Sequence, residues 1–453
     1  MAAMQGRNWI GGEWVSTGVK RDSRNPATGE VIGSYFDSDA ATAQAAIDAA
    51  RRAFGTGHWR DDIYLRAKVL GRLADAFEAR LGEVIDTLCL ENGKVRGEAT
   101  FEASLIPRSF RFAVGLSMHN FGRVLETRPG QQAMSIREPV GVAGLIIPWN
   151  SLAYLAIRAL APALAAGCTV VVKLPHQAAQ TAALMADIIA SVGDLPAGVV
   201  NIFTESGSDG AKLLVDSPDV PVISFTGSTA TGRMIAKAAA ASLKRVGLEL
   251  GGKTPHLVFN DAQLEVVLPT LEKSSTVFAG QFCMTGSRIL VQRGIAEKVS
   301  RVDGLVKAAI ASGAKAIVRG GPAESPALAG GAFYHPSLLE VTDNKMPIVR
   351  DETFAPVQTL QVFDTEEEAI ALANDSDYGL SACVWSRDVD RPIRVARRLQ
   401  AGLISINGWA NLALEFEEGG FKGSGSGRLG GVASIEDFLE YKQITQDFIP
   451  QAH

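Results

Sequence analysis

The amino-acid sequence predicts an α/β protein with a parallel sheet that helices cover on both faces. Between residues 142 and 227, nearly continuous apolar runs, often β-branched, alternate with stretches of helical spacing. That alternation is the signature of a buried parallel sheet. The chain has 453 residues, of which 47% are hydrophobic. This composition suffices for a large core and for two or three domains.

The N-terminal third is predicted to be largely helical. Apolar residues recur at helical spacing between Ala40 and Phe54, with Asp39 placed to cap the first turn. A similar pattern runs from Tyr64 to Leu90. Side chains three and four positions apart lie on one face of a helix, so each stretch can bury one face against a core.

The middle of the chain alternates between strand-like and helix-like segments. Strands are predicted at residues 142–147, 169–173, 199–203 and 220–227. Helices are predicted at residues 153–165 and 178–191, with a short one after Gly207. The Gly-rich sequence ELGGKTP then marks a boundary near Gly251, and a second α/β region follows.

The C-terminal region is predicted to contain one long loop and one strand. Residues 417–431, EEGGFKGSGSGRLGG, are dense in Gly and Ser and are therefore predicted as a loop. Residues 438–448, FLEYKQITQDF, are a strand candidate. A terminal strand with an exposed edge can pair with another subunit.

Composition disfavours several kinds of partner. The net charge is −5, and no cluster of Lys and Arg forms the basic stripe that nucleic acids require. Four scattered cysteines without a CxxC pair disfavour a zinc site and a disulfide framework. The N-terminus does not read as a signal peptide, and the most apolar stretch is interrupted by an arginine. We therefore expect a cytoplasmic protein with no metal, no nucleic-acid partner and no membrane partner.

Two glycine motifs match nucleotide-binding patterns, but neither has the required context. GLELGGKT, residues 247–254, fits GxxxxGK[ST], yet Pro255 and a strand-like HLVF follow where a helix should begin. Glu249 inside that loop would also repel phosphate. GSGRLG, residues 425–430, fits GxGxxG but follows no strand and opens no clear helix. A phosphate-loop ATPase is therefore the weaker alternative.

The meaning of Cys283 depends on its companions. In GQFCMTGSR the thiol lies among small and polar residues, and alone it could be one more small buried side chain. The chain also carries PWN at 148–150, FTGSTATG at 225–232, LELGGK at 248–253 and DETFAP at 351–356. In this order, and together with WIGGEWV and NPATGEVI near the N-terminus, these motifs make the chain resemble the NAD(P)-dependent aldehyde dehydrogenase superfamily over nearly its whole length.

The resemblance implies a catalytic trio. Cys283 matches the nucleophile that converts an aldehyde into a thiohemiacetal, which gives up hydride more readily than the free carbonyl. The Asn150 side-chain amide and the Cys283 backbone N–H match the oxyanion hole. Glu249 matches the base that activates water for thioester hydrolysis, and members that transfer the acyl group to coenzyme A lack it. We expect nearby donors or the cofactor charge to lower the pKa of Cys283.

The resemblance also implies a site for NAD, with NADP possible. Gly227, Ser228 and Gly232 match the turn beside the pyrophosphate, where glycine permits close approach because it has no Cβ. Lys173 matches the residue that binds the adenine ribose. Glu352 matches the carboxylate that binds the nicotinamide ribose.

Three further residues border the implied cofactor site. Trp149 belongs to the PWN motif, and Phe354 would lie beside the nicotinamide ring. His176 stands where a glutamate usually holds the adenosine ribose diol. Loss of that acid removes a repulsion against the 2′-phosphate of NADP, and a partly protonated His176 could attract it. We therefore expect NAD use with NADP tolerated.

The implied substrate funnel departs from an apolar tunnel. Arg158 stands where an aromatic residue is usual, and Glu417 and Glu418 stand where Pro and Phe are common. Phe282, next to the thiol, is a further candidate for substrate contact. These residues favour a polar or charged aldehyde, with Arg158 and Glu418 as selectors. The alternative is that Arg158 and Glu418 pair with each other or with solvent.

The sequence predicts three parts. Residues 1–124 and 141–250 form a Rossmann-like NAD(P)-binding domain, and residues 251–431 form an α/β catalytic domain that carries the thiol. Residues 125–140 and 432–453 form a small β oligomerisation element, so a homodimer or homotetramer is expected.

Two alternatives stay open at this point. The chain is shorter than the family pattern by a few dozen residues around Val299–Val302, which suggests a segment that is unrepresented in this numbering. A catalytically silent homologue could also keep the fold for a structural or binding role. The presence of Cys283, Asn150 and Glu249 together disfavours that role, because an inert scaffold has no physical need for the trio.

Overall fold

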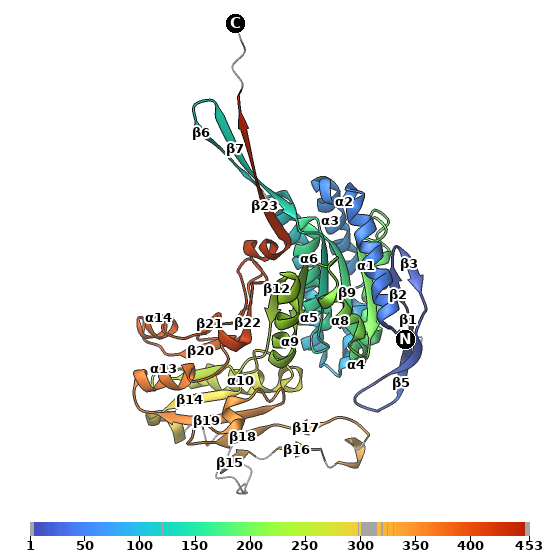
Figure 1. Cartoon of the computed structure of the whole chain (residues 1–453). Coiled ribbons are helices and arrows are strands. Elements are labelled where there is room, and N and C mark those ends of the chain that lie inside the picture. Colours follow the sequence, from blue (N-terminus) through green and yellow to red (C-terminus); the bar gives the residue numbers. More distant parts are fainter. Residues whose placement is uncertain are drawn as a thin grey trace.

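Two α/β units and a projecting three-stranded sheet make up the chain (Figure 1). The structure, a computed structural model, describes residues 4–119, 121–297, 299, 315–318, 320–323, 325–328 and 330–448. The segment around Val299–Val302, which is predicted to be short, lies outside the described residues apart from Val299.

The first unit contains an eight-stranded sheet. In spatial order its strands are β22 (Gly425–Ser426), β12 (Arg245–Glu249), β11 (Val222–Thr226), β8 (Val142–Ile146), β9 (Thr169–Pro175), β10 (Val200–Glu205), β2 (Asn8–Ile10) and β3 (Glu13–Val15). The strands from β12 to β10 are parallel to one another. Chain order reverses at β8, so the crevice at the carboxyl ends of β8 and β11 is where such sheets bind ligands.

Helices cover both faces of this sheet, which confirms the predicted fold class. One core is formed with α3 (Ile63–Ala79), α4 (Leu81–Asn92), α5 (Arg96–Met118), α6 (Leu152–Ala166) and α7 (Ala179–Ala190). The opposite core is formed with α1 (Ala40–Gly55), α8 (Asp209–Asp216) and α9 (Thr229–Ala239). Asp39 caps α1 as predicted, because its Oδ1 accepts the Thr42 N–H at 2.9 Å. The short helix α2 (His58–Asp61) precedes α3.

The second unit contains a seven-stranded sheet. Its strands in spatial order are β15 (Lys315–Val318), β18 (Ser337–Glu340), β19 (Val357–Phe363), β14 (Arg288–Gln292), β13 (Pro255–Val258), β20 (Ser381–Trp385) and β21 (Leu403–Ile406). All pairs are parallel except β15 with β18. Helix α10 (Leu264–Thr276) packs on one face, and α13 (Glu366–Asn374) and α14 (Arg391–Ala396) pack on the other.

Smaller elements complete the two units. They are the sheet of β1 (Met4–Gly6), β5 (Val31–Asp37) and β4 (Val19–Arg24), the ribbon of β16 (Gly321–Pro322) and β17 (Tyr334–His335), and the helix α12 (Pro347–Arg350). No helix begins at Lys253, because the chain leads directly into β13. The rejection of a phosphate loop at residues 247–254 is therefore supported.

Two local predictions need correction. The helical pattern from Tyr64 to Leu90 is divided between α3 and α4, which meet at Arg80. The predicted loop 417–431 contains β22, which pairs with β12. A Cβ on Gly425, whose φ is +136°, would lie 2.0 Å from the Leu248 carbonyl oxygen. Only glycine therefore allows this pairing.

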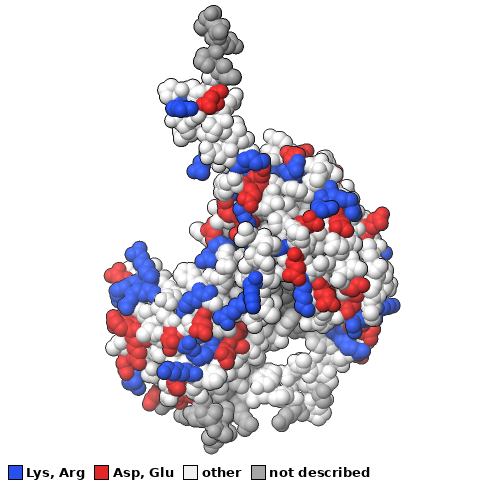
Figure 2. Space-filling view, viewed as in Figure 1, with Lys and Arg blue, Asp and Glu red and all other residues white. Residues whose placement is uncertain are grey.

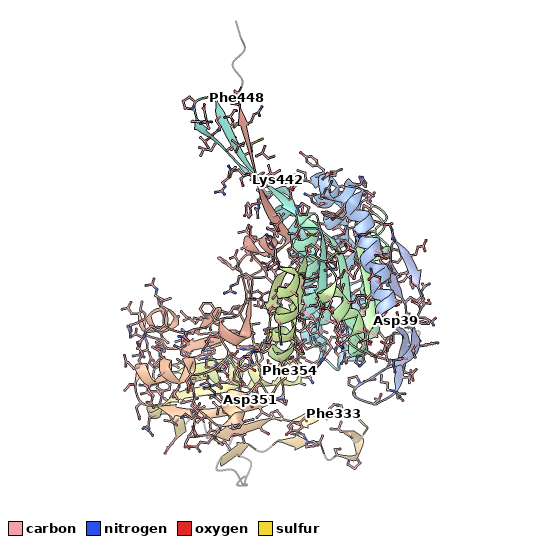
Figure 3. All side chains as sticks on the ribbon, in the orientation of Figure 1. Asp39, Phe333, Asp351, Phe354, Lys442 and Phe448 are labelled. Carbon is pink, nitrogen blue, oxygen red and sulfur yellow. The ribbon has the colours of Figure 1, made fainter. Side chains whose placement is uncertain are left out.

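A three-stranded antiparallel sheet projects from the first unit. It consists of β23 (Leu439–Asp447), β7 (Gln131–Pro139) and β6 (Arg123–Arg128). Figure 3 places Lys442 near the base of the projecting strand and Phe448 just past its far end, away from the body. The chain enters β23 through the turn Val432–Phe438, whose Ile435 and Phe438 belong to the core of the first unit.

The described helices and surface side chains show the following features. In the part of the chain that the structure describes, no helix is long and apolar enough to span a bilayer. Among the same residues, no group of three or more His, Cys, Asp and Glu side chains is placed to hold a metal ion. Figure 2 shows acidic and basic side chains interspersed over the face in view.

Candidate active site

The candidate residues gather where the two α/β units meet. Asn150 follows β8, and Glu249 ends β12, so both lie at the carboxyl edge of the first sheet. Cys283 precedes β14 and Glu352 precedes β19, so both lie at the amino edge of the second sheet. Figure 3 shows Phe354 on the side of the second unit that faces the first. The fold therefore brings four distant segments of the chain to one place.

A left-handed turn carries the chain from α10 to Cys283. Residues 278–280 have φ angles of 50°, 55° and 74°. Such angles cost free energy in residues other than glycine, and they cluster at functional sites. The turn is held by Glu98, whose Oε1 accepts the Phe278 N–H at 3.0 Å, and by the Lys94 ammonium, 3.8 Å from the centroid of the Phe278 ring.

Asn150 is fixed to the loop that carries the thiol. Its side chain is buried, and its Nδ2 donates to the Gln281 carbonyl oxygen at 3.0 Å. The carbonyl of the preceding Trp149 accepts a hydrogen bond of 2.9 Å from the Asn92 amide. These contacts hold the Asn150 amide within reach of the backbone two residues before Cys283, as an oxyanion-hole donor requires.

Gly251 and Gly252 thread between Glu352 and the thiol loop. A Cβ on Gly251 would lie 2.3 Å from Glu352 Oε2, and one on Gly252 would lie 2.4 Å from the Cys283 carbonyl oxygen. The Gly252 N–H donates to Glu352 Oε1 at 3.0 Å. The motif LELGGK was recognised from the sequence, but this role of its glycines was missed. The signal for this role in the sequence is the pair of adjacent glycines that follows Leu250.

Glu249 is a buried carboxyl group that lacks a full set of partners. Its side chain is 6% exposed, and its Oε1 has no hydrogen-bond partner. Burial raises the pKa of Glu249 to about 8, while the charge of Arg158 acts in the opposite direction. The group is therefore poised to exchange a proton near neutral pH.

The Cys283 thiol departs from the prediction of a lowered pKa. Burial raises its pKa to about 12, and the charge of Arg158 acts in the opposite direction. The carboxyl groups of Glu352, Glu418 and Glu249 further oppose ionisation. The protein groups around Cys283 therefore favour a neutral thiol, contrary to the expectation that nearby donors lower its pKa, and a lowering by the cofactor charge stays a prediction.

Arg158 and Glu418 form a buried ion pair. Arg158 Nη1 lies 3.0 Å from Glu418 Oε1, and both side chains are about nine-tenths buried. The Tyr154 hydroxyl donates to the same Oε1 at 3.5 Å, and Arg158 Nη2 donates to Thr226 Oγ1 at 3.4 Å. The sequence leaves two roles open for these residues, and the structure shows the one in which Arg158 and Glu418 pair with each other.

A cavity of about 320 Å³ borders this ion pair. Its lining combines apolar and polar groups, and contributing residues include Tyr154, Leu403, Ser405, Asn411, Phe416 and Glu418. Phe282 lies nearer the thiol, where its ring meets Phe278 and Trp409 edge to face at centroid distances of 5.5 and 5.8 Å. Trp409 was not identified from the sequence, because only contact with Phe282 reveals it.

The turn after β11 combines a helix cap with tightly packed glycines. The Ser228 hydroxyl caps α9 by accepting the Thr231 N–H at 3.2 Å. A Cβ on Gly227 would lie 2.5 Å from the Phe225 ring, and one on Gly232 would lie 2.5 Å from the Leu250 side chain. Packing within the chain therefore requires glycine at both positions, whatever approaches the turn.

Two other predicted cofactor residues lie at the end of β9. Burial lowers the pKa of Lys173 and of His176, and the charge of Lys173 lowers the pKa of His176 further. Both effects disfavour the protonated form of His176 that could attract a 2′-phosphate. On the opposite side of the site, Trp149 and Phe354 meet edge to face with ring centroids 6.0 Å apart.

The comparisons with known proteins agree with this geometry. The sequence model of the aldehyde dehydrogenase family matches residues 14–301 and 296–444. The 2-aminomuconic semialdehyde dehydrogenase of Danio rerio is 39% identical, with 97% of each chain covered. The chain belongs to the aldehyde dehydrogenase family.

Other members of the family show the same relationship. The 2-hydroxymuconic semialdehyde dehydrogenase of Pseudomonas sp. (strain CF600) is 35% identical, with 97% of this chain and 98% of the relative covered. A crystal structure of Staphylococcus aureus betaine aldehyde dehydrogenase with NAD⁺ superposes with a TM-score of 0.93 at 32% identity. The superposition covers 99% of this chain and 96% of the Staphylococcus aureus chain.

This aldehyde dehydrogenase has fewer residues than its relative inside the aligned region. The alignment with the Danio rerio protein spans 479 positions but covers only roughly 440 residues of this chain, a difference of about 40. The two parts of the family match meet at residues 296–301, where the sequence predicts the shorter segment.

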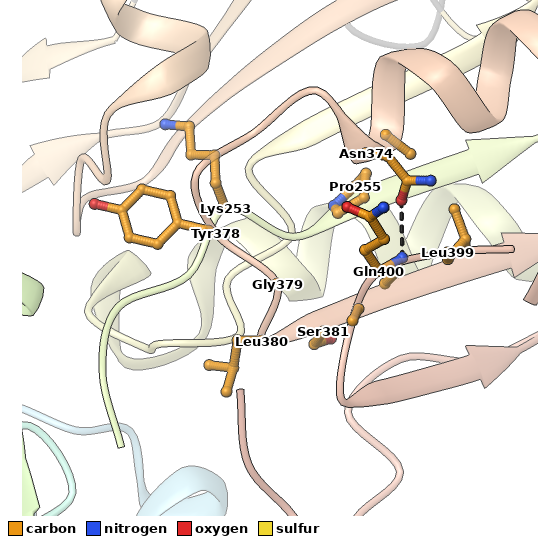
Figure 4. A pocket seen from close by; sticks show the side chains of 12 residues that line it. Lys253, Pro255, Asn374, Tyr378, Gly379, Leu380, Ser381, Leu399 and Gln400 are labelled. Atoms are coloured by element: carbon orange, nitrogen blue, oxygen red, sulfur yellow. Dashed lines mark hydrogen bonds between the residues drawn. The ribbon is translucent and has the colours of Figure 1, made fainter. Parts of the chain in front are cut away.

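A small pocket near the dehydrogenase site is unsuited to an aldehyde (Figure 4). It measures about 10 Å³ and is lined by residues that include Lys253, Tyr378 and Gln400. That volume holds about one water molecule. Burial lowers the pKa of Lys253 to about 8, but the cavity beside Glu418 is much larger, at about 320 Å³.

Proposed function

We propose that this aldehyde dehydrogenase oxidises a polar or charged aldehyde to the carboxylate with NAD⁺, and tolerates NADP⁺, through a thioester on Cys283. One observation carries the proposal: the Asn150 amide, the unpartnered carboxyl oxygen of Glu249 and the Cys283 thiol converge from three separate segments. A scaffold without activity has no need for that convergence.

The first step is attack of the Cys283 sulfur on the aldehyde carbon. The thiol proton must leave, and ionised Glu249 is the base that the surroundings supply. The carbonyl oxygen becomes an alkoxide as the carbon–sulfur bond forms. The Asn150 Nδ2–H and the Cys283 N–H stabilise that charge, and Asn150 then exchanges its bond to Gln281 for one to the alkoxide.

The residues present fit a dinucleotide. Ser228 opens α9 at the ligand-binding edge of the sheet, where helix N–H groups favour a pyrophosphate. Glu352 is oriented by the Gly252 N–H and offers Oε2 to a ribose hydroxyl. Lys173 lies at the end of β9, and Phe354 lies beside Trp149. When bound, NAD⁺ supplies the acceptor for the hydride.

The second half of the reaction is hydrolysis of the thioester. Glu249 first releases to solvent the proton that it took from the thiol, and it then accepts a proton from water as the water oxygen attacks the thioester carbon. The carbon–sulfur bond breaks, the Cys283 thiolate takes this proton from Glu249, and the product loses its own proton to solvent and leaves as the carboxylate. A carboxyl group with a pKa of about 8 can both accept and release this proton near neutral pH.

The substrate proposal rests on the cavity beside the ion pair. Tyr154 and Glu418 line it, and Glu418 is paired with Arg158. A wholly apolar aldehyde would leave these polar groups without new partners, whereas a charged or hydroxylated one could bond to them. Two relatives are named for semialdehydes of muconic acids, which are polar aldehydes.

We further propose a homodimer or homotetramer in a reducing compartment such as the cytoplasm. The sheet of β6, β7 and β23 supports an oligomer, because it projects from the body and every residue of β6 is exposed. We also propose the three parts predicted from the sequence, which are the NAD(P)-binding domain, the catalytic domain and the oligomerisation element. All four cysteines are free, which suits a reducing compartment.

The direct test is formation of NADH from a panel of aldehydes. We expect charged or hydroxylated aldehydes to have higher kcat/KM than simple aliphatic ones, and Cys283→Ala to be inactive with all of them. A faster reaction with simple aliphatic aldehydes would overturn the substrate proposal. Undiminished activity in Cys283→Ala would overturn the mechanism.

A further inference from the structure

The Arg158–Glu418 pair lies on the same side of the sheet as Glu249. Thr226 of β11 and Glu249 of β12 are register partners in a parallel pair, so their side chains point to the same face. Arg158 Nη2 contacts Thr226 Oγ1 at 3.4 Å, which places the guanidinium beside Glu249. Its Nη1 holds Glu418 at 3.0 Å.

Both neighbours retain unused hydrogen-bonding capacity. Arg158 Nε and Glu249 Oε1 are buried, and neither has a partner. A purely structural ion pair would be expected to satisfy such atoms, because each unsatisfied buried polar group costs about 1–3 kcal/mol. In this arrangement the charge of Arg158 acts on two carboxyl groups, those of Glu418 and Glu249.

We propose that the Arg158–Glu418 ion pair is a positioning device that sets the ionisation of Glu249, and with it the pH at which the thioester is hydrolysed. The proposal rests on the assignment of Glu249 as the base in the proposed function. Arg158 favours the Glu249 carboxylate, whereas Glu418 opposes it directly and also draws on the charge of Arg158.

Other charged groups also face Glu249 and are accounted for. Arg428, from the C-terminal loop, favours the carboxylate, but its guanidinium is bonded to the Gly420 and Gly427 carbonyl oxygens. Asp437, from the turn before β23, opposes the carboxylate. The Cys283 thiol faces the same space and is held neutral by burial. Arg158 is the charged neighbour with the largest effect on Glu249.

The two members of the pair have opposite effects when removed. Loss of the Arg158 charge disfavours the Glu249 carboxylate, so the pKa of Glu249 rises and hydrolysis requires higher pH. Loss of the Glu418 charge favours the carboxylate, so this pKa falls and hydrolysis proceeds at lower pH. A residue that merely supported the fold would slow the reaction without moving its pH profile in opposite directions.

The test uses p-nitrophenyl acetate and the full-length enzyme. Steady-state release of p-nitrophenol after the initial burst reports hydrolysis of the acetyl thioester and needs neither an aldehyde nor a cofactor. We expect the wild-type rate to rise with pH around a midpoint near 8. Arg158→Met should move the midpoint up and Glu418→Gln should move it down. A midpoint that moves by about one pH unit changes the rate at pH 7 by about tenfold.

Matched variants separate charge from packing. Arg158→Lys keeps the charge, so its midpoint should lie closer to that of the wild type than the midpoint of Arg158→Met. Arg96→Met removes a charge from an exposed pair with Asp86, and its midpoint should not move. If Arg158→Met does not fold, Glu418→Gln and Arg158→Lys still decide the matter, because Glu418→Gln must lower the midpoint.

The outcomes distinguish this inference from the proposed function. Suppose that Glu249→Gln abolishes the pH-dependent step, but the midpoints of Arg158→Met and Glu418→Gln do not move or move in the same direction. That result would overturn the role of the ion pair and leave the assignment of Glu249 as base intact. If Glu249→Gln kept the wild-type profile, the assignment of Glu249 as base would fail, and this inference would fail with it.

Discussion

Two buried charge clusters flank α6, and they differ in how fully their hydrogen bonds are satisfied. At the start of the helix, Glu102 Oε1 accepts the N–H groups of Ala153 and Tyr154 at 3.0 and 3.3 Å. Glu102 Oε2 pairs with Lys94, whose ammonium also lies over the Phe278 ring. Farther along, Arg158 pairs with Glu418 but leaves its Nε unpartnered.

The difference separates support from chemistry. The Lys94–Glu102 cluster caps a helix and holds the left-handed turn that leads to Cys283, so its atoms are engaged in the folded state. The cluster of Arg158, Glu418 and Glu249 keeps buried atoms free, and such atoms can engage a substrate or a moving proton. Changes in the first cluster should therefore affect stability, and changes in the second should affect turnover.

The largest effect is expected from Glu249→Gln. Loss of the base should slow thioester hydrolysis by on the order of 10²–10⁴-fold. Thermal stability should stay the same or rise, because a buried carboxyl group with an unpartnered oxygen becomes a neutral amide. Steady-state kinetics and a melting curve on the same preparation measure both quantities. A large loss of stability with normal turnover would break the comparison.

Lys94→Met tests the satisfied cluster. It leaves Glu102 buried without its cation, so we expect a loss of about 3–5 kcal/mol in the free energy of unfolding. The control is Lys68→Met, which removes an exposed partner of Asp194 and should cost no more than about 1 kcal/mol. Chemical denaturation measures both. Equal stability of the two variants would contradict a structural role for Lys94.

Asn150→Ala tests whether the Asn150 amide stabilises the oxyanion during catalysis. Removal of one oxyanion-hole donor should lower kcat by about 10²–10³-fold. The loss should appear in both the dehydrogenase and the ester reactions, because both form an oxyanion at Cys283. A defect in KM alone would show that Asn150 binds substrate without stabilising the transition state.

The smallest effect is expected at His176, on the edge of the cofactor site. Burial and the charge of Lys173 lower the pKa of His176, which disfavours the cation that would attract a 2′-phosphate. Replacement by Glu adds a negative charge and should lower kcat/KM for NADP⁺ relative to NAD⁺ by on the order of tenfold. An unchanged ratio would place His176 away from the ribose.

The sequence predicts the scaffold well where local patterns decide it. The alternation of apolar runs with helical stretches predicts the parallel sheet, and Asp39 marks the start of α1 because a cap depends on neighbouring residues alone. The order of the motifs predicts the family. By contrast, β22 depends on contact between Gly425 and a strand far away in sequence, so no local pattern reveals it.

The electrostatics of the site could not be predicted from residue types. The Cys283 pKa is raised, because burial and three carboxyl groups outweigh Arg158. The lowered pKa of His176 depends on its burial beside Lys173. Both are consequences of three-dimensional proximity. The sequence raises the pairing of Arg158 with Glu418 as an alternative, but only the fold places the pair beside Glu249.

The most direct measurement is the mass of the acyl-enzyme formed by Glu249→Gln with p-nitrophenyl acetate, incubated until release of p-nitrophenol levels off, because loss of Glu249 also slows attack by the thiol, and mapped by peptide digestion. If the cluster around Cys283 and Glu249 carries the chemistry, one acetyl group accumulates on the peptide that contains Cys283, and it persists far longer than in the wild type. Acetylation at another residue, or hydrolysis at the wild-type rate, would contradict the account.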